Sequence, residues 1–141
     1  MKTLEVKKSV NYIPDLGRKA IANQKDAIQH FIHKMDIEMI DAFLDDDKTY
    51  QDYEKSVFIA KMKFVFERFE SFGDRFLLPI AGRCAVCDKT KTGFSFYGNI
   101  SKNYINIIFD REDNKINDLY DCSSFQNVEN DVKLNEQIFF D

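Results

Sequence analysis

Residues 53–72 have the sequence YEKSVFIAKMKFVFERFESF, from which the architecture of the whole chain can be inferred. Its apolar side chains recur at helical spacing: Phe58, Met62, Val65, Phe69 and Phe72. At about 100° per residue they fall within a wedge roughly 80° wide, and charged residues occupy most of the remaining surface. Such a stripe of phenylalanines needs a large apolar partner. We therefore expect one long amphipathic helix packed on a sheet.

The sheet is predicted downstream, where the apolar period changes from helical to alternating. Four segments have strand character: Phe76–Cys84, Gly93–Gly98, Tyr104–Asp110 and Ile116–Phe125. Consecutive antiparallel pairing is the simplest topology for them. The expected fold class is therefore α+β, with N-terminal helices and the long helix packed on a curved four-stranded antiparallel sheet.

Two shorter helices are predicted before the long one. The first spans about Arg18 to Lys34, and Asp36 stands where it would cap a second helix over Ile37–Leu44. Three carboxylates at residues 45–47 oppose the helix dipole, so that helix should end there.

The ends of the long helix also carry signals. Thr49-x-x-Asp52 resembles a helix-start signature, although Asp is shorter than the usual Glu or Gln partner. Gly73 stands where a glycine commonly follows the last helical turn.

The length of 141 residues predicts a single domain. We divide it into an arm (1–17), a helical part (18–73), the sheet (76–125) and a tail (126–141). The tail is polar until Ile138, Phe139 and Phe140. This apolar triplet is expected to dock on the domain; as a loose end it would be a partner-binding peptide.

The charge is distributed unevenly along the chain. The net formal charge is −4, with seven Lys/Arg against three Asp/Glu in residues 1–34 and thirteen against twenty-one in residues 35–141. The two balances, +4 and −8, sum to that value. An acidic C-terminal part repels phosphate backbones and anionic membranes, so neither nucleic acid nor a membrane is an expected partner. A basic protein partner, or simply a contribution to solubility, fits the acidic part better.

The N-terminal residues contain no apolar run typical of a signal peptide, and no stretch of 18 apolar residues occurs in the chain. Three cysteines form an odd set that does not indicate a disulfide framework. We expect a cytoplasmic protein with reduced thiols.

The sequence GRCAVCDKTKTG contains Cys84 and Cys87 in a C-x-x-C arrangement. Such a turn can hold two zinc thiolates or a redox pair. Cys122 is the remaining thiol, but a consecutive meander would place it roughly 20 Å away at about 3.3 Å per residue. Free thiols in a turn, a zinc site and a redox pair all stay open. A strand order that folds back would bring Cys122 closer.

Four further side chains are candidates for chemistry. His30 and His33 have the spacing of two metal ligands on one helical face, but they lie opposite the apolar stripe, which favours solvated side chains. Asp118 and Tyr120 share one face of the last strand, with Cys122 and Ile116. A pocket on that face would make them an acid–base pair, whereas a solvated face would make them surface residues.

The predicted elements follow in the order helix, residues 39–47 (MIDAFLDDD), a short extended segment, a second helix and then strands. This order resembles the cone-shaped nuclear transport factor 2-like fold, also called SnoaL-like or cystatin-like. The resemblance covers about residues 20–125. It implies a cavity between helix and sheet that serves as an isomerase or dehydratase site, as a ligand pocket or as a plain core.

We expect a non-enzymatic module that binds a protein or a small apolar ligand, because a phenylalanine-rich core occurs without a recognisable catalytic set. There are two alternatives. One is a small pocket enzyme of the isomerase or hydrolase type that uses Asp118 or a helix-borne histidine, and the other is a structural zinc protein built on Cys84 and Cys87. An exposed sheet edge or face would also support a homodimer.

Overall fold

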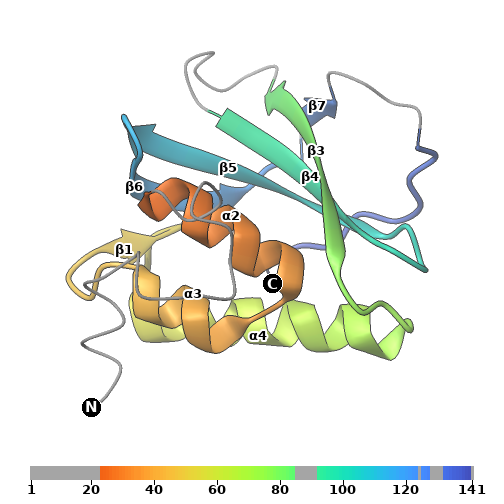
Figure 1. Cartoon of the computed structure of the whole chain (residues 1–141), viewed down its shortest axis with the longest axis horizontal. Helices are drawn as coiled ribbons and strands as arrows, with labels where there is room; N and C mark the ends of the chain where they lie inside the picture. Colours follow the sequence, from red (N-terminus) through yellow and green to blue (C-terminus); the bar gives the residue numbers. More distant parts are fainter. Residues whose placement is uncertain (1–22, 85–91, 124, 128–131, 141) are drawn as a thin grey trace.

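The computed structural model describes residues 23–84, 92–123, 125–127 and 132–140 (Figure 1). Its elements are α2 (Gln24–Lys34), α3 (Ile37–Phe43), β1 (Thr49–Tyr50), β2 (Tyr53–Glu54), α4 (Lys55–Ser71), β3 (Leu77–Cys84), β4 (Thr92–Gly98), β5 (Tyr104–Glu112), β6 (Lys115–Asp121) and β7 (Phe125–Asn127). The predicted α+β class is confirmed. The predicted N-terminal arm and the expected helix start at Arg18 lie outside the described residues.

The main sheet has the strand order β6-β5-β4-β3-β7, with all neighbours antiparallel. The predicted consecutive meander is confirmed for β3 to β6. The predicted last strand, Ile116–Phe125, is wrong, because β6 ends at Asp121 and Phe125 pairs with Cys84 at the opposite edge. The Asn106 side chain donates to the Cys122 carbonyl across 3.2 Å, so the chain leaves β6 over the sheet face on which that side chain lies.

The helices gather on one side of the main sheet (Figure 1) and share one core with it. Along α4 the buried residues are Phe58, Met62, Val65, Phe66 and Phe69. Four of them belong to the predicted stripe. Phe72, its last member, is 37 % exposed, because it caps the helix end and lies beyond the last residue that faces the core.

Three of the four predicted helix-end signals are confirmed. The α3 helix ends at Phe43, just before the three carboxylates of residues 45–47. The Asp36 side chain accepts a hydrogen bond from Met39 N (3.2 Å). Gly73 has a φ of 95°, and the bonds Gly73 N to Glu70 O and Asp74 N to Phe69 O form the glycine-dependent helix ending known as the Schellman motif.

The predicted helix start at Thr49 and Asp52 is wrong. These residues belong to a tight β1–β2 hairpin, whose central residues Gln51 and Asp52 have φ values of 51° and 65°. Two successive positive φ angles are typical of a type I′ hairpin turn and are incompatible with a helix. The α4 helix therefore begins at Lys55, after Glu54, which makes no side-chain cap bond.

A bulge changes which side chains of β6 face the core. Asp118 lies opposite Asp110, but Ile116 lies opposite Arg111, so Asn117 is an extra residue in β6. Alternation is interrupted there. Ile116 therefore joins Leu119 in the core, and its predicted position on the face of Asp118 is wrong.

The docking predicted for the C-terminal triplet is confirmed. Ile138 and Phe140 are buried, and the Phe140 ring lies 5.1 Å from that of Phe58. The tail also pairs with the start of β5, where Tyr104 N donates to Glu136 O (2.9 Å). The tail therefore completes the core and covers an edge that β6 leaves open.

A buried carboxylate joins the end of α4 to the β4–β5 turn. Asp74 is 3 % exposed and accepts hydrogen bonds from Ile100 N (2.8 Å), Ser101 N (2.7 Å) and Ser101 Oγ (2.6 Å). Gly98 packs directly against this carboxylate.

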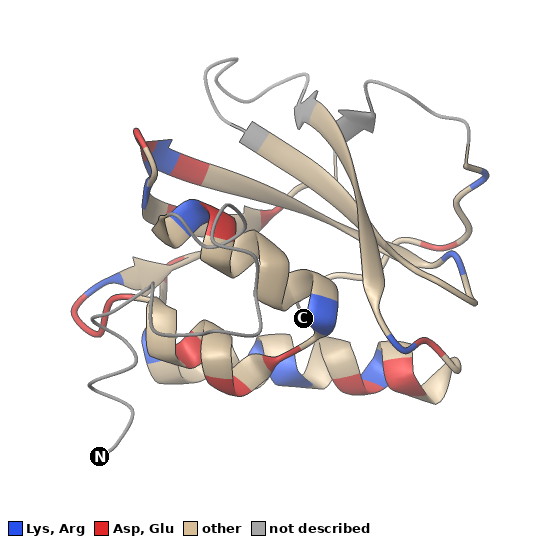
Figure 2. Ribbon diagram, viewed as in Figure 1, with Lys and Arg blue, Asp and Glu red and all other residues tan. Residues whose placement is uncertain are grey.

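Figure 2 shows that charged residues concentrate on the helices and turns, whereas β4 carries none. Within the described residues, every helix is too short or too polar to cross a bilayer.

Candidate functional site

The most distinctive surface is the acidic face, which we define as residues 36–54 of α3 and the β1–β2 hairpin. It contains eight carboxylates and one lysine, Lys48. The carboxylates are Asp36, Glu38, Asp41, Asp45, Asp46, Asp47, Asp52 and Glu54. All except Asp36 and Asp45 are exposed. The nineteen residues therefore carry a net formal charge of −7, and six of their carboxylates are exposed to solvent.

The acidic face is hollowed. An open depression of about 600 Å³ lies between α3, the hairpin and the start of α4, and Asp41, Asp47 and Glu54 are among its lining residues. A second depression, of about 650 Å³, contains Asp45 and adds Glu112 and Asp113 from the β5–β6 turn. The negative surface thus extends from α3 to the edge of the main sheet.

Both lysines that line the first depression are engaged in internal contacts. Lys55 is only 10 % exposed, and its Nζ lies 2.6 Å from Asp46 Oδ1, 3.1 Å from Asp41 Oδ1 and 3.1 Å from the Leu44 carbonyl. Lys55 therefore ties the end of α3 to the start of α4. Its charge offsets only part of the surrounding negative charge.

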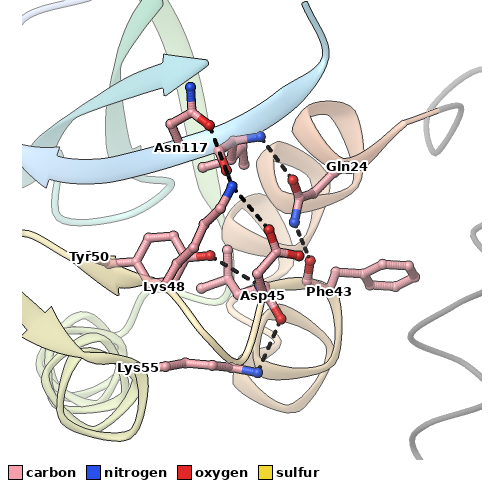
Figure 3. Close-up of polar contacts among 9 residues, drawn as sticks. Gln24, Phe43, Asp45, Lys48, Tyr50, Lys55 and Asn117 are labelled. Atoms are coloured by element: carbon pink, nitrogen blue, oxygen red, sulfur yellow. Dashed lines mark hydrogen bonds and ion pairs between the residues drawn. The ribbon is translucent and has the colours of Figure 1, made fainter. Parts of the chain in front are cut away.

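Lys48 makes the corresponding connection to the sheet (Figure 3). Its Nζ lies 3.1 Å from Asp45 Oδ2, 3.0 Å from the Ile116 carbonyl and 3.4 Å from Asn117 Oδ1. These contacts hold the loop after α3 against the outer edge of β6.

Two neutral side chains complete this network (Figure 3). Gln24 donates to the Phe43 carbonyl (2.7 Å) and accepts from Ile116 N (2.8 Å), so one amide links α2, α3 and β6. The buried Tyr50 hydroxyl accepts from Asp45 N (3.0 Å). Burial raises the pKa of Tyr50 well above its usual value, so its hydroxyl stays protonated at physiological pH.

The hairpin is clamped to β6 through Gln51. Its backbone N donates to Asp118 Oδ1 (2.8 Å), while its side chain donates to Asp121 Oδ1 (3.1 Å) and accepts from Asp121 N (2.9 Å). Non-glycine residues with positive φ cost of order 1 kcal/mol or more each. The clamp offsets that cost and keeps the hairpin in one position.

Neither Asp118 nor Tyr120, the predicted acid–base pair, is among the residues that line the two depressions described above. Asp118 is half-buried and accepts from Gln51 N and Leu119 N, each at 2.8 Å. Burial raises the pKa of Asp118, while these two hydrogen bonds oppose the rise. Tyr120 packs against Ile108 and Cys122. Of the two alternatives left open by the sequence, neither a fully solvated surface nor a pocket describes Asp118, because the hairpin partly covers it.

The structure describes only two of the three cysteines for which a role was predicted. Cys87 lies outside the described residues, Cys84 is placed through its backbone in β3, and Cys122 is buried. The spacing argument that kept Cys122 away from Cys84 is wrong, because Cys84 pairs with Phe125, only three residues after Cys122. Among the described residues, no three His, Cys, Asp or Glu side chains form a group that could hold a metal ion.

The expectation of solvated histidines is wrong. His30 and His33 are both half-buried, because α2 packs against β3 as well as against the helices. His33 Nδ1 lies 2.6 Å from the Leu77 carbonyl. His33 also lines an open depression of about 660 Å³ with residues 34–38, Arg75 and Phe76.

The sequence analysis did not detect the acidic face as one surface. The signal was present in the composition of residues 36–54, but the acidic residues were assigned to a helix end, a turn and a helix start. Comparisons of the chain with protein-family models, with curated proteins and with solved structures found no match.

Proposed function

We propose that this chain is a non-enzymatic protein-binding domain whose acidic face docks a basic partner. The observation that carries the proposal is the excess of eight carboxylates over one lysine in residues 36–54, of which six carboxylates are exposed. Complementary charge accelerates encounter and selects partners by sign. A partner with clustered Lys or Arg side chains matches this surface.

The rigidity of the acidic face supports the same proposal. Lys48, Lys55, Gln24 and the Gln51 clamp hold α3, the hairpin and β6 together through hydrogen bonds and ion pairs of 2.6–3.4 Å. A surface already fixed in its binding shape loses less conformational entropy on association. The partner therefore meets a preorganised array of carboxylates.

The resemblance to the nuclear transport factor 2-like fold remains part of the proposal. The order of two short helices, a long helix and an antiparallel meander supports it. We also propose that α4 is amphipathic and that the sheet is curved. Support comes from the buried row on α4 and from the short connection of residues 122–124 between strands at opposite edges.

A binding titration with a defined cationic probe tests the function. We would measure the affinity of the full chain for an oligolysine peptide as a function of salt. The test variant is Asp47→Asn/Asp52→Asn/Glu54→Gln, which removes three exposed carboxylates of the acidic face. The control Glu67→Gln/Glu70→Gln/Glu136→Gln removes three exposed carboxylates elsewhere, with the same change in net charge.

We expect the test variant to lose roughly tenfold in affinity, since exposed charge pairs contribute about 0.2–1 kcal/mol each. The control should lose less than about twofold, and the salt dependence of the test variant should be shallower. Equal losses in the two variants would show that only net charge matters. That result would refute a defined docking face.

A further inference from the structure

The outward surface of α4 carries three exposed apolar side chains, Val57, Ala60 and Phe64, which we call the exposed row. Phe64 is 54 % exposed, more than any other aromatic side chain in the described part of the chain. At about 100° per residue the three positions fall within roughly 60° of the helix circumference. Apolar residues at this spacing are typical of a helix face that packs along a second helix. Ala60 is the smallest of the three, so a large partner side chain can approach α4 between its neighbours.

The exposed row adjoins the acidic face. Ser56 and Ile59 line the depression of about 600 Å³ together with the acidic side chains of that face, among them Glu54. Ser56, Ala60 and Phe64 follow one another at four-residue spacing, which places them in one line along the helix surface. The line therefore leads from the depression to the exposed row.

The lysines near the exposed row leave the negative charge of the acidic face in excess. Lys55 is engaged in the ion pairs described above. Lys61 lies with its Nζ 4.7 Å from the centre of the Tyr53 ring. Lys63 is exposed, but the exposed Glu67 follows it four residues later on the same side of α4 and offsets its charge. A ligand that covers the exposed row therefore meets negative charge along the side of the depression.

We propose that the exposed row and the acidic face together bind an amphipathic helix whose apolar side is flanked by Lys or Arg. This inference rests on the proposed function and names the class of partner. The apolar side of the bound helix covers the exposed row, and its cationic side chains reach the acidic depression. Apolar anchors give such a complex its affinity, while complementary charge selects the partner and its orientation. A second copy of this chain carries the same net charge of −4 and matches the surface less well.

Peptide binding to the full chain is the test. The probe is a designed peptide of about 18 residues, with Leu at helical spacing, Lys at the other positions and one Trp on the apolar side. The control peptide has the same composition in a scrambled order. Because the chain contains no Trp, the fluorescence reports the peptide alone. We expect the patterned peptide to bind at least about tenfold more tightly than the scrambled one, with its emission shifted to shorter wavelength.

Two substitutions assign that preference to the exposed row. Phe64→Ser and Ala60→Gln should each remove most of the preference while leaving the affinity for oligolysine unchanged, because neither alters a charge. Both positions are exposed, so the fold should tolerate the changes. The control Ile100→Ser removes a side chain that is 62 % exposed in the β4–β5 turn, and it should keep the full preference.

Three results would overturn the inference. Equal affinity for the two peptides, with oligolysine binding still weakened by Asp47→Asn/Asp52→Asn/Glu54→Gln, would leave the proposed function standing and refute helix binding. Insensitivity of both oligolysine and peptide binding to that triple variant would refute the proposed function itself. A wild-type dimer in sedimentation that Phe64→Ser converts to a monomer would assign the exposed row to a second copy of the chain.

Discussion

Replacing Gly98 with alanine tests the buried contact between β4 and Asp74. A Cβ at residue 98 would lie 2.1 Å from Asp74 Oδ2, 2.2 Å from Cγ and 2.5 Å from Oδ1, whereas ordinary contacts begin near 3.4 Å. The carboxylate would have to move by about 1 Å or more. It is 3 % exposed and accepts three hydrogen bonds from the β4–β5 turn, so movement disrupts them.

The expected cost follows from those bonds. A hydrogen bond to a charged group contributes about 1.5–3 kcal/mol, so losing two of the three costs about 3–6 kcal/mol. That is a large share of the roughly 5–15 kcal/mol by which a domain is stable. We therefore expect Gly98→Ala to lower the urea midpoint of unfolding strongly, measured by far-ultraviolet circular dichroism.

A double-mutant cycle separates steric clash from any other effect at residue 98. Asp74→Ala removes the carboxylate and should itself destabilise, because Ile100 N and Ser101 N lose their acceptor. Adding Gly98→Ala to Asp74→Ala should then cost less than about 1 kcal/mol, since the clashing atoms are gone. Additive effects in the cycle, or a Gly98→Ala variant within about 0.5 kcal/mol of wild type, would refute the reasoning.

Three further outcomes are expected. Burial, with smaller contributions from His33 and Lys34, lowers the pKa of His30, so the imidazole is protonated in the unfolded chain at a higher pH than in the folded protein. The free energy of unfolding should therefore fall as the pH drops below about 6.5. Urea titrations at several pH values should show that His30→Gln makes this fall less steep. Burial raises the pKa of Asp118 above 3.8, so the wild type loses stability relative to Asp118→Asn as pH rises from about 4 to 7; a constant difference across that range would contradict the burial argument. Phe140→Ala should cost about 3–5 kcal/mol because the ring is buried against Phe58, while Phe139→Ala, 39 % exposed, should cost much less; equal midpoints of thermal unfolding would show that the tail is not part of the core.

Features that depend on neighbouring residues could be predicted from the amino-acid sequence. The α4 stripe, the Asp36 cap and the Gly73 helix ending each involve residues within a few positions of one another, so their physical causes are visible in a short window. The strand character of β3 to β6 was visible for the same reason, although the bulge in β6 was not. Antiparallel pairing of consecutive strands then needed only short connections.

Features that depend on distant partners become apparent only in the folded chain. The β1–β2 hairpin is clamped by Asp118 and Asp121, nearly seventy residues away, which overrides a local helix-start signal. Likewise, β7 occupies the free edge of β3, a site that exists only after the meander has formed.

The candidate sites divide in the same way. The negative charge of residues 36–54 is a property of the sequence, but its gathering into one hollowed face depends on Lys48, Lys55 and Gln24 bridging α2, α3, α4 and β6. The burial of His30 and His33 depends on β3 packing against α2. A helical pattern identifies the face on which a side chain lies, whereas the elements that cover that face come from elsewhere in the chain.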